Sequence, residues 1–155
     1  MKHLSLFILL SLFLFSCSSD DEPVVACDLK QAIQSNLYID LVNGQGENLI
    51  EKGTYNPDDI TIDFNGSTFT GTVFTGVQGI ENFIAIGIFG EDGENTLEIH
   101  LSETETDTLV MNLTRSETGG PCSQFVFALN SVVYNGETQD VQDFGGDFLT
   151  TVVKE

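Results

Sequence analysis

Few residues in this sequence have the types and spacing that catalysis or metal binding requires. Zinc sites usually hold four ligands that include close cysteine or histidine pairs. Cys27 and Cys122 are far apart, and His100 is the one histidine beyond the N-terminal apolar segment. The sequence also lacks a Gly-x-Ser-x-Gly nucleophile elbow and a phosphate-binding loop. We therefore expect a protein that is not an enzyme and holds no zinc.

Acidic residues suggest a different site, because hard cations such as calcium take carboxylate and carbonyl oxygens. None of the acidic stretches has the spacing of an EF-hand loop, so we interpret them as solvated loop tips and expect no bound cofactor, with structural calcium as the alternative. A glycosidase needs two carboxylates at a fixed separation. Among 24 acidic residues some pair will meet this requirement, so its presence does not distinguish a glycosidase from other proteins. Calcium is the only cofactor that we consider, and its candidate ligands are Asp58, Asp59, Glu91, Asp92 and Glu94.

His100 lies in the alternating stretch 98–101, Glu-Ile-His-Leu. In a strand, successive side chains point to opposite faces. His100 should therefore share a face with Glu98, opposite Ile99 and Leu101. We predict a surface histidine on the polar face of a strand.

The N-terminus has the layout of a secretory signal. A short basic stretch precedes an apolar run from Leu4 to Phe15, and Cys17 follows it closely. The run is shorter than the roughly 20 residues that a membrane-spanning helix needs. Residues 14–17, Leu-Phe-Ser-Cys, resemble a relaxed lipobox, which implies a signal peptide over 1–16 and acylation (palmitate) on Cys17. A secreted protein without lipid and an uncleaved anchor are the alternatives.

The residues after Cys17 resemble a known export signal. Residues 18–23 read Ser-Ser-Asp-Asp-Glu-Pro, which is similar to the acidic stretch behind the lipidated cysteine in surface-exposed envelope lipoproteins of the Bacteroidota, of the flavobacterial type. The resemblance covers residues 1–23 and implies an outer-membrane lipoprotein on the cell surface, with the periplasmic face as the alternative. We predict a signal peptide over 1–16, a lipidated cysteine with an acidic linker over 17–26, and one domain over 27–155.

The charge of the chain limits its partners. The formal net charge is −19, and removal of residues 1–16 takes away one basic residue and no acidic one. Nucleic-acid binding needs a basic face, and an anionic membrane surface would repel this domain. We expect contact with the membrane through the lipid, no nucleic-acid partner, and an envelope protein or a glycan as the possible ligand. The absence of tryptophan argues against a glycan.

With Cys17 assigned to lipid, Cys27 and Cys122 remain as an even pair outside the cytoplasm, where disulfides persist. Closing so long a loop stabilises the fold by about 4 kcal/mol in the chain-entropy model. We predict a Cys27–Cys122 disulfide.

The domain alternates apolar and polar residues with period two, the signature of half-buried strands. Asn-Gly and Asp-Gly pairs fall where hairpin turns are expected. We predict an all-β fold, an antiparallel β-sandwich of about eight strands, with a small up-and-down, lipocalin-like barrel as the alternative. The apolar runs 80–89 and 125–129 should be central core strands, and most phenylalanines beyond the signal should be buried. The strands are expected at 37–42, 60–64, 67–75, 81–89, 96–102, 108–114, 124–134 and 137–153, the last one broken at Gly145-Gly146.

These observations favour a non-enzymatic, envelope-tethered lipoprotein that binds or scaffolds another component. The first alternative is a lipocalin-like carrier that holds a small apolar ligand inside a barrel. A surface hydrolase is the third hypothesis.

Overall fold

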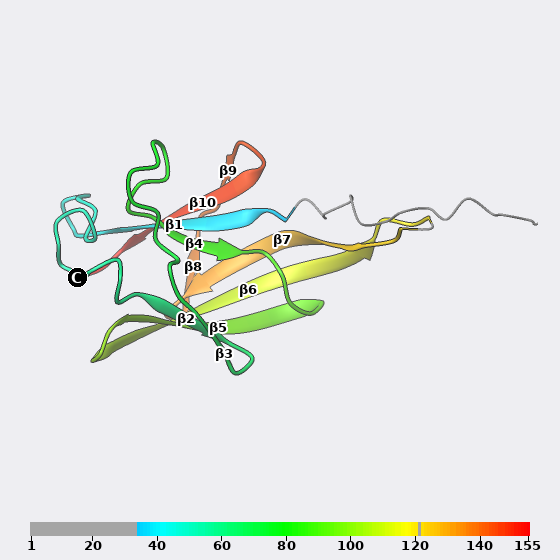
Figure 1. Ribbon diagram of the computed structural model, residues 1–155, viewed down its shortest axis with the longest axis horizontal. Helices are drawn as coiled ribbons and strands as arrows, with labels where there is room; N and C mark the ends of the chain where they lie inside the picture. The colour runs from blue at the N-terminus through cyan, green and yellow to red at the C-terminus, as the bar shows by residue number, and fades with distance from the viewer. Residues whose placement is uncertain (1–33, 121) are drawn as a thin grey trace, which may run out of the picture. The chain divides into compact units, whose positions relative to one another are not determined.

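The computed structural model describes residues 34–120 and 122–155. All secondary-structure elements in this part of the chain are β-strands, and they form the two sheets of a β-sandwich (Figure 1). No helix in this part of the chain is long and apolar enough to cross a membrane. The predicted all-β sandwich is confirmed, and the barrel alternative is wrong because the sheets do not close. The predicted signal peptide, the acidic linker, Cys17 and Cys27 lie outside the described residues.

The ten strands are β1 Asn36–Val42, β2 Thr61–Phe64, β3 Ser67–Phe69, β4 Ile84–Gly87, β5 Gly93–Ser102, β6 Glu105–Glu117, β7 Phe125–Tyr134, β8 Glu137–Gln139, β9 Gln142–Phe144 and β10 Asp147–Val153. The first sheet has the order β4-β1-β10-β9. The second sheet has the order β3-β2-β5-β6-β7-β8. The break predicted at Gly145-Gly146 in the segment 137–153 is confirmed, with both glycines at positive φ, and a further break after Gln139 divides the segment into three strands.

The paired strands are antiparallel, as predicted, with the exception of β1 and β10, which pair parallel. Their register runs from Leu37 beside Phe148 to Val42 beside Val153. Turn signals in a sequence specify only local hairpins, so the sequence contained no sign of a contact between the first and the last strand. The first sheet is consequently mixed rather than purely antiparallel.

Two predicted Asn-Gly turns form the tight hairpins of the second sheet. Asn65 and Gly66 join β2 to β3, and Asn135 and Gly136 join β7 to β8, all four at positive φ. Positive φ at both central residues is the requirement of a type I′ turn, which asparagine and glycine meet at low cost. These turns fix the register of both hairpins.

The core lies between the two sheets. Alternate residues of β1, β5 and β6 point into it, as the period-two pattern predicted. Leu37, Ile39 and Leu41 of β1 are fully buried, and so are Ile99 of β5 and Leu109 of β6. Each such side chain stabilises the fold by roughly 2 kcal/mol through burial.

Two predictions about the apolar segments are wrong. The run 80–89 contributes β4, which is the edge strand of the first sheet rather than a central one. At the start of β7, Phe125 is 49 % exposed. Of the nine phenylalanines beyond the signal, only Phe64 is buried among the described residues. Composition counts apolar residues but does not say whether they line the core or the rim of a sheet.

A polar network at one end of the sandwich joins the two sheets. Lys154 follows β10, and its backbone N–H donates to the carbonyl of Val42 in β1 at 2.8 Å. Its Nζ donates to Glu105 Oε1 at 2.5 Å and to Asp107 Oδ2 at 2.6 Å, both in β6. The Tyr134 hydroxyl of β7 donates to the same Asp107 oxygen at 2.6 Å. A lysine of the first sheet is thus held by carboxylates of the second.

The charges in this network stabilise each other. Burial would raise the pKa of the Asp107 carboxyl, but hydrogen bonds from Lys154, Tyr134 and Asn135 outweigh burial and hold this pKa below its usual value. Burial likewise opposes the charge of Lys154, but its bonds to Asp107 and Glu105 raise the ammonium pKa. Burial, followed by the hydrogen bond to Asp107, raises the pKa of Tyr134. Asp107 and Lys154 are therefore both charged at neutral pH, and Tyr134 is a neutral donor.

Removal of the lysine charge should destabilise the fold strongly. Lys154→Met keeps the length of the side chain but leaves Asp107, which is 5 % exposed, without its cation, a loss of about 3 kcal/mol. Lys52→Met is the matched control, because Lys52 is half exposed and pairs with the exposed Glu47. That variant should lose less than about 1 kcal/mol. Urea denaturation at pH 7 measures both values, and equal losses would contradict the role of the network.

The same network predicts a pH dependence. Because the pKa of folded Asp107 lies below that of an unfolded aspartate, about 3.9, its contribution is present above that pH and is lost as the pH falls through the folded pKa. Asp107→Asn should lower the free energy of unfolding at pH 7, and the difference from the wild type should shrink toward pH 2. Asp58→Asn, at an exposed position, should change stability little at either pH. A difference for Asp107→Asn that stays constant with pH would refute this account.

Candidate functional site

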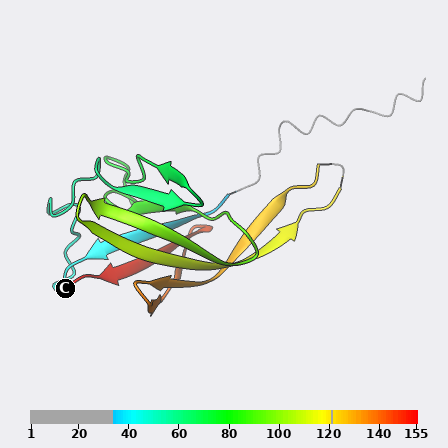
Figure 2. The same ribbon diagram turned by 90° about the horizontal axis from the view of Figure 1, so that it is seen from below.

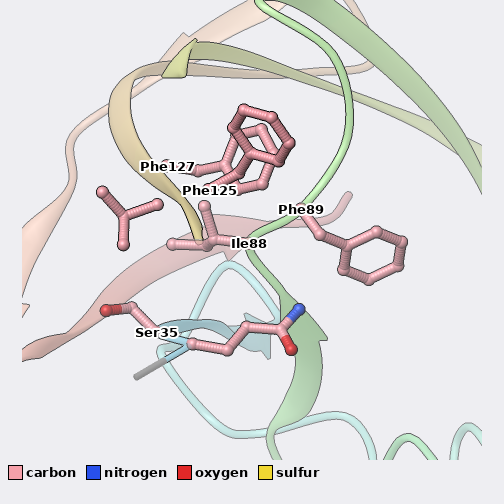
Figure 3. A pocket seen from close by; sticks show the side chains of 7 residues that line it. Ser35, Ile88, Phe89, Phe125 and Phe127 are labelled. Atoms are coloured by element: carbon pink, nitrogen blue, oxygen red, sulfur yellow. The ribbon is translucent and has the colours of Figure 1, made fainter. Parts of the chain in front are cut away.

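A pocket with aromatic walls opens beside the part of the β6–β7 hairpin that projects from the sandwich (Figure 2). We call it the aromatic pocket, and its volume is about 160 Å³. Figure 3 shows Phe125 and Phe127 of β7 on one side, Ser35 on the other side, and Ile88 between them. Gln34, Phe89 and Val126 also line the pocket.

The β6–β7 hairpin positions these aromatic rings because it continues after the core has ended. The inward residues of β6 are buried as far as Leu113, and from Thr114 onward the strand is exposed. Beyond that point Arg115 pairs with Phe127, and Glu117 pairs with Phe125. Phe125 is therefore exposed, and Phe127, which packs in part against the core, lines the pocket beside it.

Arg115 fastens the hairpin to the turn before β5. Its backbone N–H donates to Asp92 Oδ1 at 2.8 Å, and its guanidinium lies 3.5 Å from the centroid of the Phe125 ring. A cation over an aromatic face contributes about 0.5–1 kcal/mol at an exposed site. This contact fixes the orientation of a ring that is otherwise half exposed.

Phe89 separates the aromatic pocket from a smaller cavity of about 50 Å³ on its other side. Its ring packs edge-to-face against Phe64 at 5.5 Å and against Phe69 at 5.9 Å between centroids. A run of aromatic side chains therefore extends from the exposed edge at β3 to the aromatic pocket.

A second, polar site lies on the outer face of the second sheet, and we call it the Asp63–Glu98–His100 cluster. The carboxylate and imidazole atoms of these residues that could bind a metal lie within 4.8 Å of one another. His100 Nε2 is 3.0 Å from Asp63 Oδ2, and His100 Nδ1 is 2.8 Å from Thr106 Oγ1. The arrangement offers one nitrogen and two carboxylates to a cation.

Neighbouring residues tune this cluster. Hydrogen bonds from Thr68, and then from His100, hold the pKa of the Asp63 carboxyl below its usual value, so Asp63 is ionised at neutral pH. A shallow hollow adjoins His100 and is lined in part by Asp59, Thr61 and Ser102. The cluster is therefore accessible from solvent.

Several residues singled out in the sequence can now be placed. His100 and Glu98 share the outer face of β5, as predicted, while Ile99 and Leu101 are buried. Cys122 lies in the connection between β6 and β7, and because Cys27 lies outside the described residues, their disulfide stays a prediction. The lipid site at Cys17 also lies outside them.

Four of the five calcium candidates lie in two separate exposed turns, and the fifth, Glu94, lies in β5. In one turn, Asn56 Nδ2 donates to Asp59 Oδ2 at 3.1 Å, and Asp58 is the neighbour of Asp59. In the other turn, Asp92 accepts the hydrogen bond from Arg115, and Glu91 lies 3.7 Å from the guanidinium of the same arginine. Glu94 is exposed at the start of β5. Among the described residues, the group close enough to share a cation is the Asp63–Glu98–His100 cluster instead.

The sequence did not indicate the aromatic pocket or the role of Asp63. Asp63 alternates with the buried residues Ile62 and Phe64, but its pairing with β5 depends on a contact between distant parts of the chain. The one usable signal for the pocket was the phenylalanine content, which exceeds what this core holds.

Comparison with known proteins adds no relative. No protein-family model matches this sequence, no curated protein is detectably similar, and no solved structure has a detectably similar fold.

Proposed function

We propose that this protein is a non-enzymatic binding module, held at the cell envelope by lipid on Cys17, and that its aromatic pocket receives one apolar side chain of a partner protein. The observation that carries the binding function is the exposure of phenylalanine around a formed pocket. Phe125, which lines the aromatic pocket, is 49 % exposed, and Phe69, which contacts the pocket residue Phe89, is 40 % exposed. Contiguous exposed apolar surface in a soluble domain commonly marks an interaction site.

The size of the aromatic pocket favours a side chain over a larger ligand. A cavity of about 150 Å³ accommodates one benzene ring, and the aromatic pocket measures about 160 Å³. Pockets for drug-sized ligands are usually about 300–1,000 Å³. The buried core between the sheets also offers no barrel interior for an apolar cargo, which argues against the carrier hypothesis.

The charge of the domain favours a basic partner. The chain carries a formal charge of −19, and complementary charge around an interface speeds encounter and excludes wrong partners. An apolar anchor in a pocket surrounded by a polar rim is the usual arrangement of a binding hot spot. We therefore expect a protein with a basic surface and a protruding aromatic or aliphatic residue, and an apolar pocket favours this partner over a glycan.

Lipid on Cys17 supplies the location in this proposal. Its support is the resemblance of residues 14–17 to a lipobox and of residues 18–23 to an acidic export signal. Presentation on the outer surface follows from that resemblance, and the periplasmic face is the alternative.

The tether is tested by Cys17→Ala. Acyl chains on this residue hold the protein at a bilayer through apolar burial, so we expect the wild-type protein in the membrane fraction and the variant in the soluble fraction. Ser131→Ala is the control, because Ser131 is an exposed residue of the domain and its replacement leaves all three cysteines in place. Recovery of Cys17→Ala with the membranes would refute the tether.

The aromatic pocket is tested by a surrogate of one aromatic side chain, N-acetyl-tryptophanamide, titrated into the full-length protein and followed by NMR. We expect saturable shifts at Ser35, Ile88 and Phe127, and at least a tenfold weaker response in Phe125→Ala. Phe74→Ala is the matched control, because Phe74 is 41 % exposed and does not line the pocket; its response should equal that of the wild type.

Three outcomes would contradict the pocket proposal. The first is no saturable shift in the wild type, and the second is an equal loss in Phe125→Ala and Phe74→Ala. The third is a set of contacts between Phe125 and residues before Gln34 in the free protein, which would mean that the chain fills its own pocket.

A further inference from the structure

The Asp63–Glu98–His100 cluster has the donor atoms of a metal site. Two ligands on one zinc ion, each bound at 2.0–2.1 Å in tetrahedral geometry, lie about 3.3 Å apart. His100 Nε2 and Asp63 Oδ2 are 3.0 Å apart, and the ligand atom of Glu98 lies within 4.8 Å of both. We infer that this cluster binds a divalent transition-metal ion of the zinc type, independently of the aromatic pocket.

The sheet holds the three ligands in place without the metal. Asp63 of β2 lies directly opposite Glu98 of β5, and Thr61 lies opposite His100 in the same ladder. The residues beside them, Ile62 and Ile99, are 3 % and 0 % exposed and anchor both strands in the core. Sites built on strands keep their geometry better than sites on loops, so little ordering is needed for an ion to bind.

Thr106 lets the imidazole of His100 accept a metal without losing its other hydrogen bond. A threonine hydroxyl both donates and accepts, and Thr106 Oγ1 lies 2.8 Å from His100 Nδ1. When Nε2 carries the proton, it donates to Asp63 and Nδ1 accepts from the hydroxyl. When Nδ1 carries the proton, it donates to the hydroxyl and the lone pair of Nε2 is available to the ion. Such a partner on the second nitrogen is typical of histidines that bind metals.

The charges across β2 and β5 also call for a cation. Like charges directly opposite each other on neighbouring strands destabilise a sheet, and Asp63 and Glu98 are such a pair. The basic side chain closest to Asp63 among the described ion pairs is the imidazole of His100 itself. A divalent ion between the carboxylates would turn this repulsion into attraction.

The donor set selects the class of ion. Calcium and magnesium take oxygen ligands, whereas imidazole favours zinc, copper and nickel. Three protein ligands leave at least one position open in a tetrahedral site, and the hollow beside His100 gives water or another ligand access to it.

The test is a calorimetric titration of ZnCl₂ into chelator-treated, full-length protein. We expect one site that His100→Gln and Asp63→Asn each weaken at least tenfold, and that Thr106→Val weakens roughly tenfold by removing the group that orients the ring. Glu137→Gln is the matched control, because Glu137 is an exposed acid of β8 and lies outside both the cluster and the hollow beside His100. Its affinity for zinc should equal that of the wild type.

A second readout needs no variant. In the wild-type protein, the imidazole ¹⁵N resonance of His100 Nε2 should shift as zinc binds. The inference is overturned if this resonance does not respond, if His100→Gln binds zinc as tightly as Glu137→Gln, or if CaCl₂ competes equally for the site.

Discussion

The insertion of Lys154 between Glu105 and Asp107 is the interaction on which the arrangement of the two sheets depends. Hydrophobic packing brings the sheets together but has little directional preference. The hydrogen bonds of Lys154 have direction, since one residue bonds to β1 through its backbone and to β6 through its side chain. The parallel β1–β10 pair ends at this residue, so the network fixes the last strand against both sheets. A buried ion pair contributes less net stability than its Coulomb energy suggests, and its effect here is to select one register.

The Lys154 network and the aromatic pocket lie at opposite ends of the sandwich. The β5–β6 turn and the chain terminus lie on the side of the Lys154 network, and the projecting β6–β7 hairpin lies on the opposite side (Figure 2). The hairpin continues for several residue pairs past the last buried position, Leu113. In this part of the hairpin Phe125 remains 49 % exposed, although the domain around it is acidic. The Arg115 contact with Phe125 shows that one ring is also held in a defined orientation.

The alternating pattern predicted which residues face the core, because the period of a strand is fixed by its geometry. Ile99 and Leu101 were correctly assigned inward and His100 outward, and the Asn65-Gly66 and Asn135-Gly136 pairs marked real hairpins. The pattern could not predict which distant strands become neighbours. The β1–β10 pair and the β2–β5 pair both depend on such contacts, and the second of them brings Asp63 to His100. The metal site that we infer could therefore not be predicted from cysteine and histidine spacing, because its proposed ligands come from two strands and include carboxylates.

The position of the aromatic pocket relative to the proposed tether restricts the kind of partner that can reach it. Gln34 and Ser35 line the pocket, so the chain that leads back to Cys17 begins at the pocket itself. Seventeen positions separate Cys17 from Gln34, and a fully extended chain of that length spans at most about 60 Å. With lipid on Cys17, the pocket stays within that distance of the bilayer whatever path the linker takes.

A partner anchored in the same membrane would meet the pocket at a high effective concentration, since tethering confines both molecules to one layer. A pocket of about 160 Å³ admits one side chain, which binds weakly. At a high effective concentration such weak binding is sufficient to hold the partner. This favours a neighbouring envelope protein over a freely diffusing one.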